Sequence, residues 1–92
     1  MRANLATPVL AVEVAGREDT VDAVEQKARW YLDHGVEVVW IAIPRTRTVR
    51  VLTRAGASEH GSGERLPLHR SLPGLSPSVG DLFSQLPPPS SK

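Results

Sequence analysis

The sequence predicts an α/β fold whose mixed sheet has a strand-helix-strand-strand core between residues 8 and 54. Three observations support this prediction, and they are an apolar run at residues 9–14, a helical pattern between residues 19 and 35, and a second apolar run at residues 36–43. Two apolar runs joined by a helix of this length indicate parallel strands connected by a right-handed crossover.

The first apolar run, Val9 to Val14, is rich in β-branched residues and is bounded by Pro8 and by Ala15-Gly16. Because the run is apolar at both alternating positions, we expect a central strand that is covered on both faces of the sheet. Glu13 is its single polar residue.

The helical pattern has a start signal and a stop signal. Asp19 or Thr20 can cap the free backbone N–H groups of the first turn, and Gly35 after His34 can adopt the left-handed conformation of a helix C-cap. At about 100° per residue, the apolar side chains form one stripe that we expect to pack on the sheet. Lys27 lies outside the polar side of this helix, on its flank.

The second apolar run, Val36 to Ile43, is interrupted only by Glu37 and ends at Pro44, which cannot donate to a strand ladder. Residues 44–47 have the composition of a turn. Residues 48–54 then alternate as a strand does, so we expect them to form a hairpin with the second run and to lie nearer the edge of the sheet.

The C-terminal part of the chain carries weaker signals. Glycine and serine between residues 56 and 63 predict a loop. The short apolar pieces at residues 66–68 and 72–75 are expected to attach at the edge of the sheet, and Asp81-Leu82-Phe83 is expected to form one helical turn over the core.

These patterns divide the chain into three parts. We expect residues 1–7 to be an N-terminal lead, residues 8–86 to be the domain, and residues 87–92 to be a disordered tail rich in proline and serine. A chain of 92 residues has room for one small domain at most.

Composition excludes several kinds of protein. There is no cysteine, and the three histidines lack metal-ligand spacing, so thiolate and histidine metal centres are not expected. The net charge of +1 is too small for a broadly basic nucleic-acid-binding surface, so any contact with DNA must be local. No apolar run approaches the roughly 20 residues of a membrane span, and no signal peptide is recognisable, so we expect a cytoplasmic protein without a membrane partner.

Arginines cluster in the predicted hairpin, at Arg45, Arg47, Arg50 and Arg54. The first three are candidates for contact with DNA phosphates, which would make the chain a small binding module. The alternative is that arginine only keeps a surface hairpin soluble. The sequence leaves both interpretations open.

Glu13 and Lys27 are the best candidates for chemistry. Glu13 lies near the carboxyl end of its strand, where open α/β sheets place their ligand crevices; it either binds a cation or exchanges a proton there, or it points into solvent. Lys27, on the following helix, either stabilises charge on a phosphate or extends along the apolar surface to water. The two lie on consecutive elements that must pack together, which favours a shared site.

A series of residues in fixed order resembles a known family. The residues are Pro8, Leu10, Val12-Glu13-Val14, Lys27, Tyr31-Leu32, Gly35-Val36, Val39-Trp40 and Pro44 to Val49, followed by Leu72 to Leu75 and Asp81-Leu82-Phe83. Their order is similar to that of the Uma family of "putative restriction endonucleases", within the PD-(D/E)XK nuclease superfamily. The resemblance implies that residues 8–86 are a partial endonuclease-like domain, corresponding to the C-terminal half of a restriction-endonuclease-like fold.

The resemblance also implies an activity and a cofactor. A metal-dependent endonuclease of this kind hydrolyses DNA phosphodiester bonds, and Glu13 and the backbone carbonyl of Val14 would bind Mg²⁺ or Mn²⁺. The usual lysine two residues after the glutamate is replaced by Ala15, and Lys27 matches the helix position from which a lysine substitutes in the family.

Two departures from the family pattern suggest an alternative function. Val9 stands where family members commonly have an aspartate, and the family domain is about twice the length of this chain. A non-catalytic remnant would be expected to pair with a copy of itself or with a partner chain, because the edge of a partly covered sheet recruits other strands.

Overall fold

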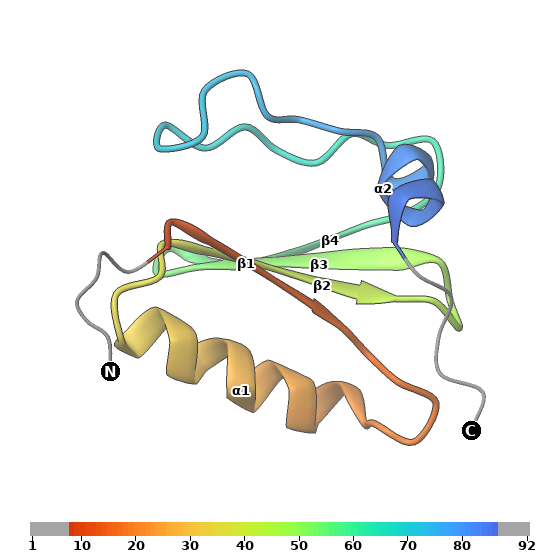
Figure 1. The fold of residues 1–92 in the computed structure, drawn as a ribbon, viewed down its shortest axis with the longest axis horizontal. Coiled ribbons are helices and arrows are strands. Elements are labelled where there is room, and N and C mark those ends of the chain that lie inside the picture. Colours follow the sequence, from red (N-terminus) through yellow and green to blue (C-terminus); the bar gives the residue numbers. More distant parts are fainter. Residues whose placement is uncertain (1–7, 87–92) are drawn as a thin grey trace.

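The computed structural model describes residues 8–86, which form a four-stranded mixed sheet with a helix on each face (Figure 1). The predicted N-terminal lead and C-terminal tail lie outside the described residues. The elements in chain order are β1 (Leu10–Val14), α1 (Val21–Asp33), β2 (Val38–Ile43), β3 (Thr48–Thr53), β4 (Gly56–His60) and α2 (Val79–Gln85).

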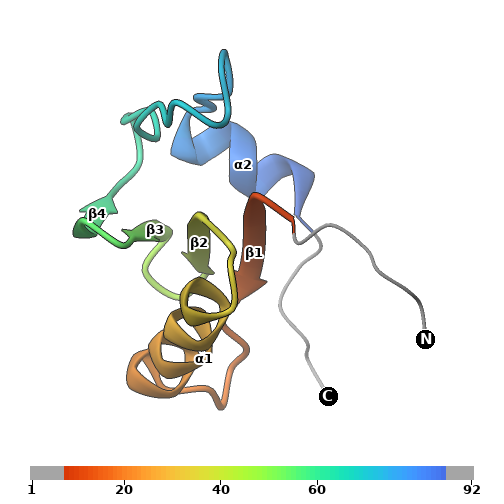
Figure 2. The same ribbon diagram turned by 90° about the vertical axis from the view of Figure 1, so that its left-hand side faces the viewer.

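The sheet has the strand order β1-β2-β3-β4. β1 and β2 are parallel and are connected through α1, whereas the pairs β2–β3 and β3–β4 are antiparallel. Figure 2 shows the three layers, with α1 on one side of the strands and α2 with its preceding loop on the other. The predicted α/β class, the mixed sheet and the strand-helix-strand-strand core are confirmed.

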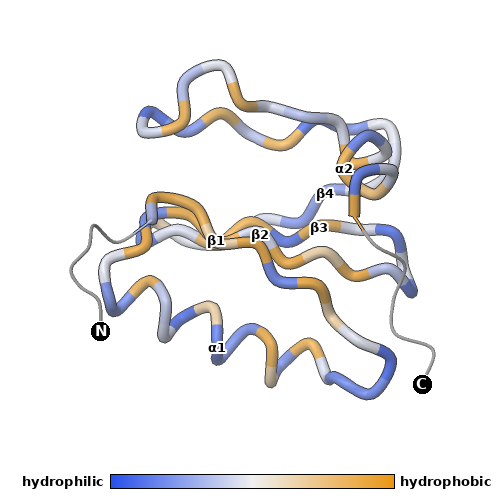
Figure 3. Tube along the Cα trace, viewed as in Figure 1, coloured by the Kyte–Doolittle hydropathy of each residue, from blue (hydrophilic) through white to orange (hydrophobic). Residues whose placement is uncertain are grey.

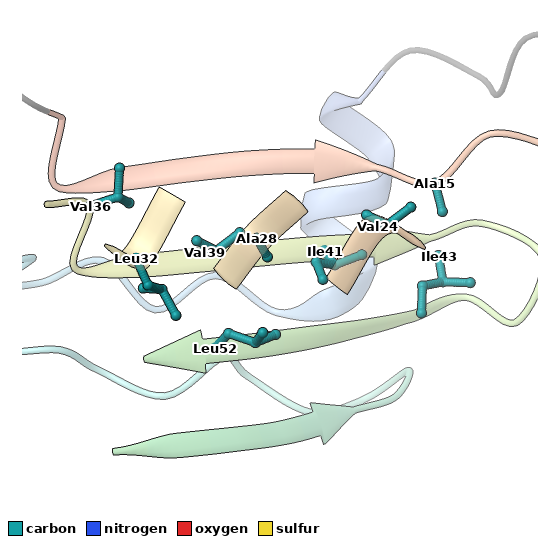
Figure 4. Close-up of a cluster of buried hydrophobic side chains, with 9 residues drawn as sticks. All are labelled: Ala15, Val24, Ala28, Leu32, Val36, Val39, Ile41, Ile43 and Leu52. Carbon is teal, nitrogen blue, oxygen red and sulfur yellow. The ribbon is translucent and has the colours of Figure 1, made fainter. Parts of the chain in front are cut away.

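β2 is the strand on which both layers pack. All six of its residues are buried, and five of them, Val38 to Ile41 and Ile43, alternate between two separate hydrophobic clusters on opposite faces of the sheet. The cluster on the α1 side is drawn in Figure 4 and consists of Ala15, Val24, Ala28, Leu32, Val36, Val39, Ile41, Ile43 and Leu52. The opposite cluster contains Val38, Trp40, Val49, Val51, Leu66 and Val79.

The prediction that the first strand is central was wrong. In the described part of the chain β1 lies at one edge of the sheet, with β2 as its neighbour, and Val12 is 40% exposed. The apolar residues on both faces of β1 correctly indicated that other elements pack above and below this strand. They carry no information about how many strands lie beside it, and the short connection from β2 to β3 adds the third strand on the other side of β2.

The region after β3 also differs from the prediction. Residues 56–60 form strand β4 rather than a loop, and β4 rather than β3 is the second edge of the sheet. The backbone of β4 pairs with β3 in register, for example Ser58 with Val51, while its side chains are mostly exposed. A strand exposed to solvent on both faces has no apolar alternation, so its glycine and serine content favoured the wrong prediction.

Residues 66–86, called the closing segment below, cover a face of the sheet and not its edge. Leu66 is buried in the cluster opposite α1, and Leu72, Leu82 and Phe83 pack against that cluster. The helical turn predicted at residues 81–83 is part of the longer helix α2, which begins after Ser78, whose hydroxyl accepts a hydrogen bond from the Asp81 amide.

Helix α1 has the predicted ends. The Thr20 hydroxyl accepts a hydrogen bond from the Ala23 amide, and Gly35 has φ 104°, in the left-handed region that favours glycine. Figure 3 shows hydrophobic and hydrophilic positions alternating along the helix, as an amphipathic helix requires. Within residues 8–86, neither helix is long and apolar enough to cross a membrane.

Candidate functional site

The register of β1 places Glu13 on the face of the sheet that α1 covers. Glu13 pairs with Ile41 of β2, and it alternates with Ala11 and Ala15, both of which pack on the α1 side. Its side chain is therefore directed towards α1 and is only 19% exposed. A carboxylate at this depth needs polar partners, because burial of an unpaired charge is costly.

Helix α1 supplies those partners from two positions four residues apart, which face the same direction on a helix. Lys27 Nζ lies 3.5 Å from Glu13 Oε1, and the Tyr31 hydroxyl donates a hydrogen bond to Glu13 Oε2 at 2.9 Å. Both carboxylate oxygens are thus in contact with the helix. The structure brings the two predicted residues Glu13 and Lys27 together, and their catalytic and metal-binding roles stay predictions.

Tyr31 is a member of the site that sequence reasoning missed, because it was assigned to the apolar stripe of α1. The hydrogen bond to Glu13, together with the negative charge of that carboxylate, raises the pKa of Tyr31 above its ordinary value. The signal that could have identified Tyr31 is its spacing, since it lies four residues after Lys27 and carries a hydroxyl at its tip.

Of Glu13 and Lys27, only Glu13 has a side chain that can bind a metal ion. Whether a divalent cation fits here therefore depends on which other oxygen donors lie near Glu13. No group of three or more His, Cys, Asp or Glu side chains that could hold a metal ion occurs in the described part of the chain. Magnesium prefers six oxygens, and proteins usually supply one or two carboxylates. Glu13, with the Val14 carbonyl next to it, therefore fits as a fragment of a metal site and not as a complete one.

The predicted arginine cluster is divided among different contacts. Arg50 lies between two carboxylates, with Nη2 2.9 Å from Glu25 Oε2 and Nη1 3.0 Å from Glu59 Oε1. The Arg47 guanidinium lies over the Phe83 ring, 5.0 Å from its centroid. Arg45 is exposed at the β2–β3 turn. The hairpin does not present these three side chains as one basic patch.

The Glu13–Tyr31 hydrogen bond predicts a raised pKa for Tyr31, which can be measured from the absorbance of this one side chain. Tyr31 is the single tyrosine of the chain, and we expect its phenol to titrate above the ordinary value of about 10. Glu13→Gln should lower this pKa, because the neighbouring negative charge is lost. Since the pKa is raised on folding, the stability that this contact contributes is present below the unfolded-state pKa and is lost as pH rises through the folded-state pKa.

The measurement is a spectrophotometric titration of the tyrosinate band in the wild-type and Glu13→Gln proteins. Glu37→Gln is the control and should leave the titration unchanged, because the Glu37 carboxylate accepts a hydrogen bond from the Ser71 hydroxyl and not from Tyr31. Identical midpoints in the wild-type and Glu13→Gln proteins would contradict the contact.

Comparisons with known proteins bear on the same region. A crystal structure of a "putative nuclease belonging to DUF820" from Anabaena variabilis superposes with a TM-score of 0.73 and 23% sequence identity, over 87% of this chain and 46% of that chain. At this identity the likeness shows the fold alone. The chain spans less than half of that nuclease, and which half it corresponds to stays a prediction. No curated protein matches the chain.

The family assignment rests on sequence. The model of the Uma2 family, described as "Putative restriction endonuclease", matches residues 2–82, which include every strand of the sheet and both residues of the predicted pair. The match covers most of the 92 residues, and it agrees with the fold shared with the Anabaena nuclease. The chain belongs to the Uma2 family of "putative restriction endonucleases".

Proposed function

We propose that this chain contributes Glu13, Lys27 and Tyr31 to a site for metal-dependent hydrolysis of DNA phosphodiester bonds, and that carboxylates from outside the described residues complete that site. The observation that carries the proposal is the Glu13 carboxylate at the carboxyl end of β1, with one oxygen 3.5 Å from Lys27 Nζ and the other 2.9 Å from the Tyr31 hydroxyl. Membership of the endonuclease family supports the choice of reaction.

The three side chains have distinct roles in this proposal. Glu13 and the Val14 carbonyl hold Mg²⁺ or Mn²⁺, a cation that in such sites activates water and neutralises charge on a phosphate oxygen. Lys27 is 59% exposed, so its ammonium can contact a substrate phosphate while it stays beside Glu13. Tyr31 restrains the carboxylate through its hydrogen bond.

The donor set explains why the site needs completion. A hard dication requires several oxygens, and at this site the described residues place the carboxylate of Glu13, both of whose oxygens already have partners on α1. Release of the Lys27 contact would free one oxygen at little cost, because exposed ion pairs contribute less than about 1 kcal/mol. We therefore expect weak metal binding and no DNA cleavage by residues 8–86 on their own.

Paramagnetic Mn²⁺ provides a test that detects weak binding. We expect Mn²⁺ to broaden the amide NMR signals of Glu13 and Val14 at lower concentrations than those of other residues. Glu13→Gln should abolish this selective broadening because the anionic ligand is lost, whereas Glu37→Gln should preserve it. Broadening that is the same at Glu13 in the Glu13→Gln protein, or that begins elsewhere in both proteins, would refute the metal role.

An association module is the second candidate function, and the edge position of β1 favours it. β1 has one neighbour in the described residues, none of its five residues is fully buried, and its exposed Val12 is apolar. Strand edges of this kind recruit further strands. The partner in this alternative is a second copy of the chain.

Sedimentation over a wide concentration range tests this alternative. We expect reversible dimerisation that Val12→Lys weakens, since a lysine on an edge strand opposes pairing. Leu68→Lys is the matched control, because Leu68 is 67% exposed but lies on the closing segment and not on β1. This substitution should leave dimerisation intact. A protein that remains monomeric at the highest concentration would exclude the module.

A further inference from the structure

A cavity of about 450 Å³ opens at the carboxyl ends of the parallel strands β1 and β2. Its walls come from two connections that are distant in sequence, the start of the β1–α1 connection and the β2–β3 turn. The lining residues are Ala15, Gly16, Arg17, Ile43, Pro44 and Arg45. Ligand sites in open α/β sheets form at this end of the strands.

The floor and the rim of the cavity differ in character. Ala15 and Ile43 are buried members of the hydrophobic cluster under α1, and Figure 4 shows them at the ends of β1 and β2. Arg17 and Arg45 are exposed, and Figure 3 shows that both connections are hydrophilic. The cavity therefore combines an apolar floor with two guanidinium groups, and none of its six lining residues is acidic.

The two arginines of the rim are free to bind an anion. Neither Arg17 nor Arg45 forms an ion pair with another residue in the range 8–86, in contrast to Arg50, which is held by Glu25 and Glu59. A guanidinium group presents a planar fork of donors that matches phosphate oxygens.

The cavity adjoins the site around Glu13. Ala15 follows Glu13 by two residues and faces the same side of the sheet. Two residues of a strand advance roughly 7 Å, so a polynucleotide that contacts Glu13 and Lys27 would extend over the cavity within one or two nucleotides.

We propose that Arg17 and Arg45 bind a backbone phosphate of a polynucleotide in this cavity, next to the phosphate acted on at Glu13. This inference rests on the proposed function for the position of the substrate, but the binding step itself requires no metal. The proposal keeps Arg45 as a DNA contact and adds Arg17, which lies in the β1–α1 connection. It removes Arg50 from the candidate DNA contacts, because the charge of Arg50 is already paired with Glu25 and Glu59.

One carboxylate opposes binding at this site. Asp19 Oδ2 accepts a hydrogen bond of 2.7 Å from the Gly16 amide, which places a negative charge beside a lining residue. Asp19→Asn retains an oxygen that can accept the same hydrogen bond and removes the charge. This substitution should therefore strengthen anion binding, whereas loss of either arginine should weaken it.

The test is fluorescence anisotropy with a short labelled single-stranded DNA, in low salt with a chelator and no divalent cation. We expect Arg17→Ala and Arg45→Ala each to weaken binding about tenfold, and each to reduce the slope of log K against log salt by about 0.7. Asp19→Asn should bind severalfold more tightly. Arg70→Ala, which removes the same charge from the closing segment at the opposite end of the sheet, should change binding less than twofold.

The control variant and a second ligand make the outcomes decisive. Equal losses in the Arg17, Arg45 and Arg70 variants would show only general charge attraction and would overturn the proposal, as would no loss in the first two. Displacement of the labelled DNA by inorganic phosphate as well as by unlabelled DNA, at an equal concentration of phosphate groups, would overturn the assignment of a polynucleotide ligand. This result would indicate a site for a small anion. The DNA-binding assay contains no metal, so its result can be interpreted even if the Mn²⁺ test at Glu13 fails. In the same way, loss of DNA binding would not affect the result of the Mn²⁺ test.

Discussion

Burial of β2 on both faces is the interaction around which the rest of the protein is arranged. Five of its six residues belong to the cluster under α1 or to the cluster under the closing segment, so both layers pack on this strand. The apolar surface removed from water in this way is the main stabilising contribution in a domain of this size. The same burial fixes the register of β1, because Ala11 must face α1 and Leu10 must face the other cluster.

That register determines the candidate site. Once Ala11 and Ala15 are directed towards α1, Glu13 between them is directed there too, and the crossover helix brings Lys27 and Tyr31 over it. The Glu13–Lys27 pair has little value for stability, since Lys27 is largely exposed and exposed ion pairs are weak. The pair lies at the carboxyl end of the two parallel strands, close to the cavity between Arg17 and Arg45, and this position is the basis of the proposed substrate contact.

Local signals in the sequence were sufficient for β1, α1, β2 and β3, and for the meeting of Glu13 with Lys27. The sequence did not indicate which elements lie beside one another in the fold. The pattern of β1 does not encode that it lies at the edge of the sheet formed by residues 8–86, and the exposed residues of β4 carry no periodic signal. The partners of Arg50 come from α1 and β4, at separations that spacing along the chain cannot reveal. Tyr31 was overlooked because its ring packs on the core while its hydroxyl reaches Glu13.

In the proposed function, the chain supplies one part of a nuclease site and requires further carboxylates for activity. Incubation of the purified 92-residue protein with supercoiled plasmid DNA in Mg²⁺ or Mn²⁺, beside its Glu13→Ala variant, tests it most directly. We expect no cleavage by the wild-type protein above that seen with the variant. Cleavage that depends on the metal and disappears in Glu13→Ala would show that the chain holds a complete active site, and would contradict the account.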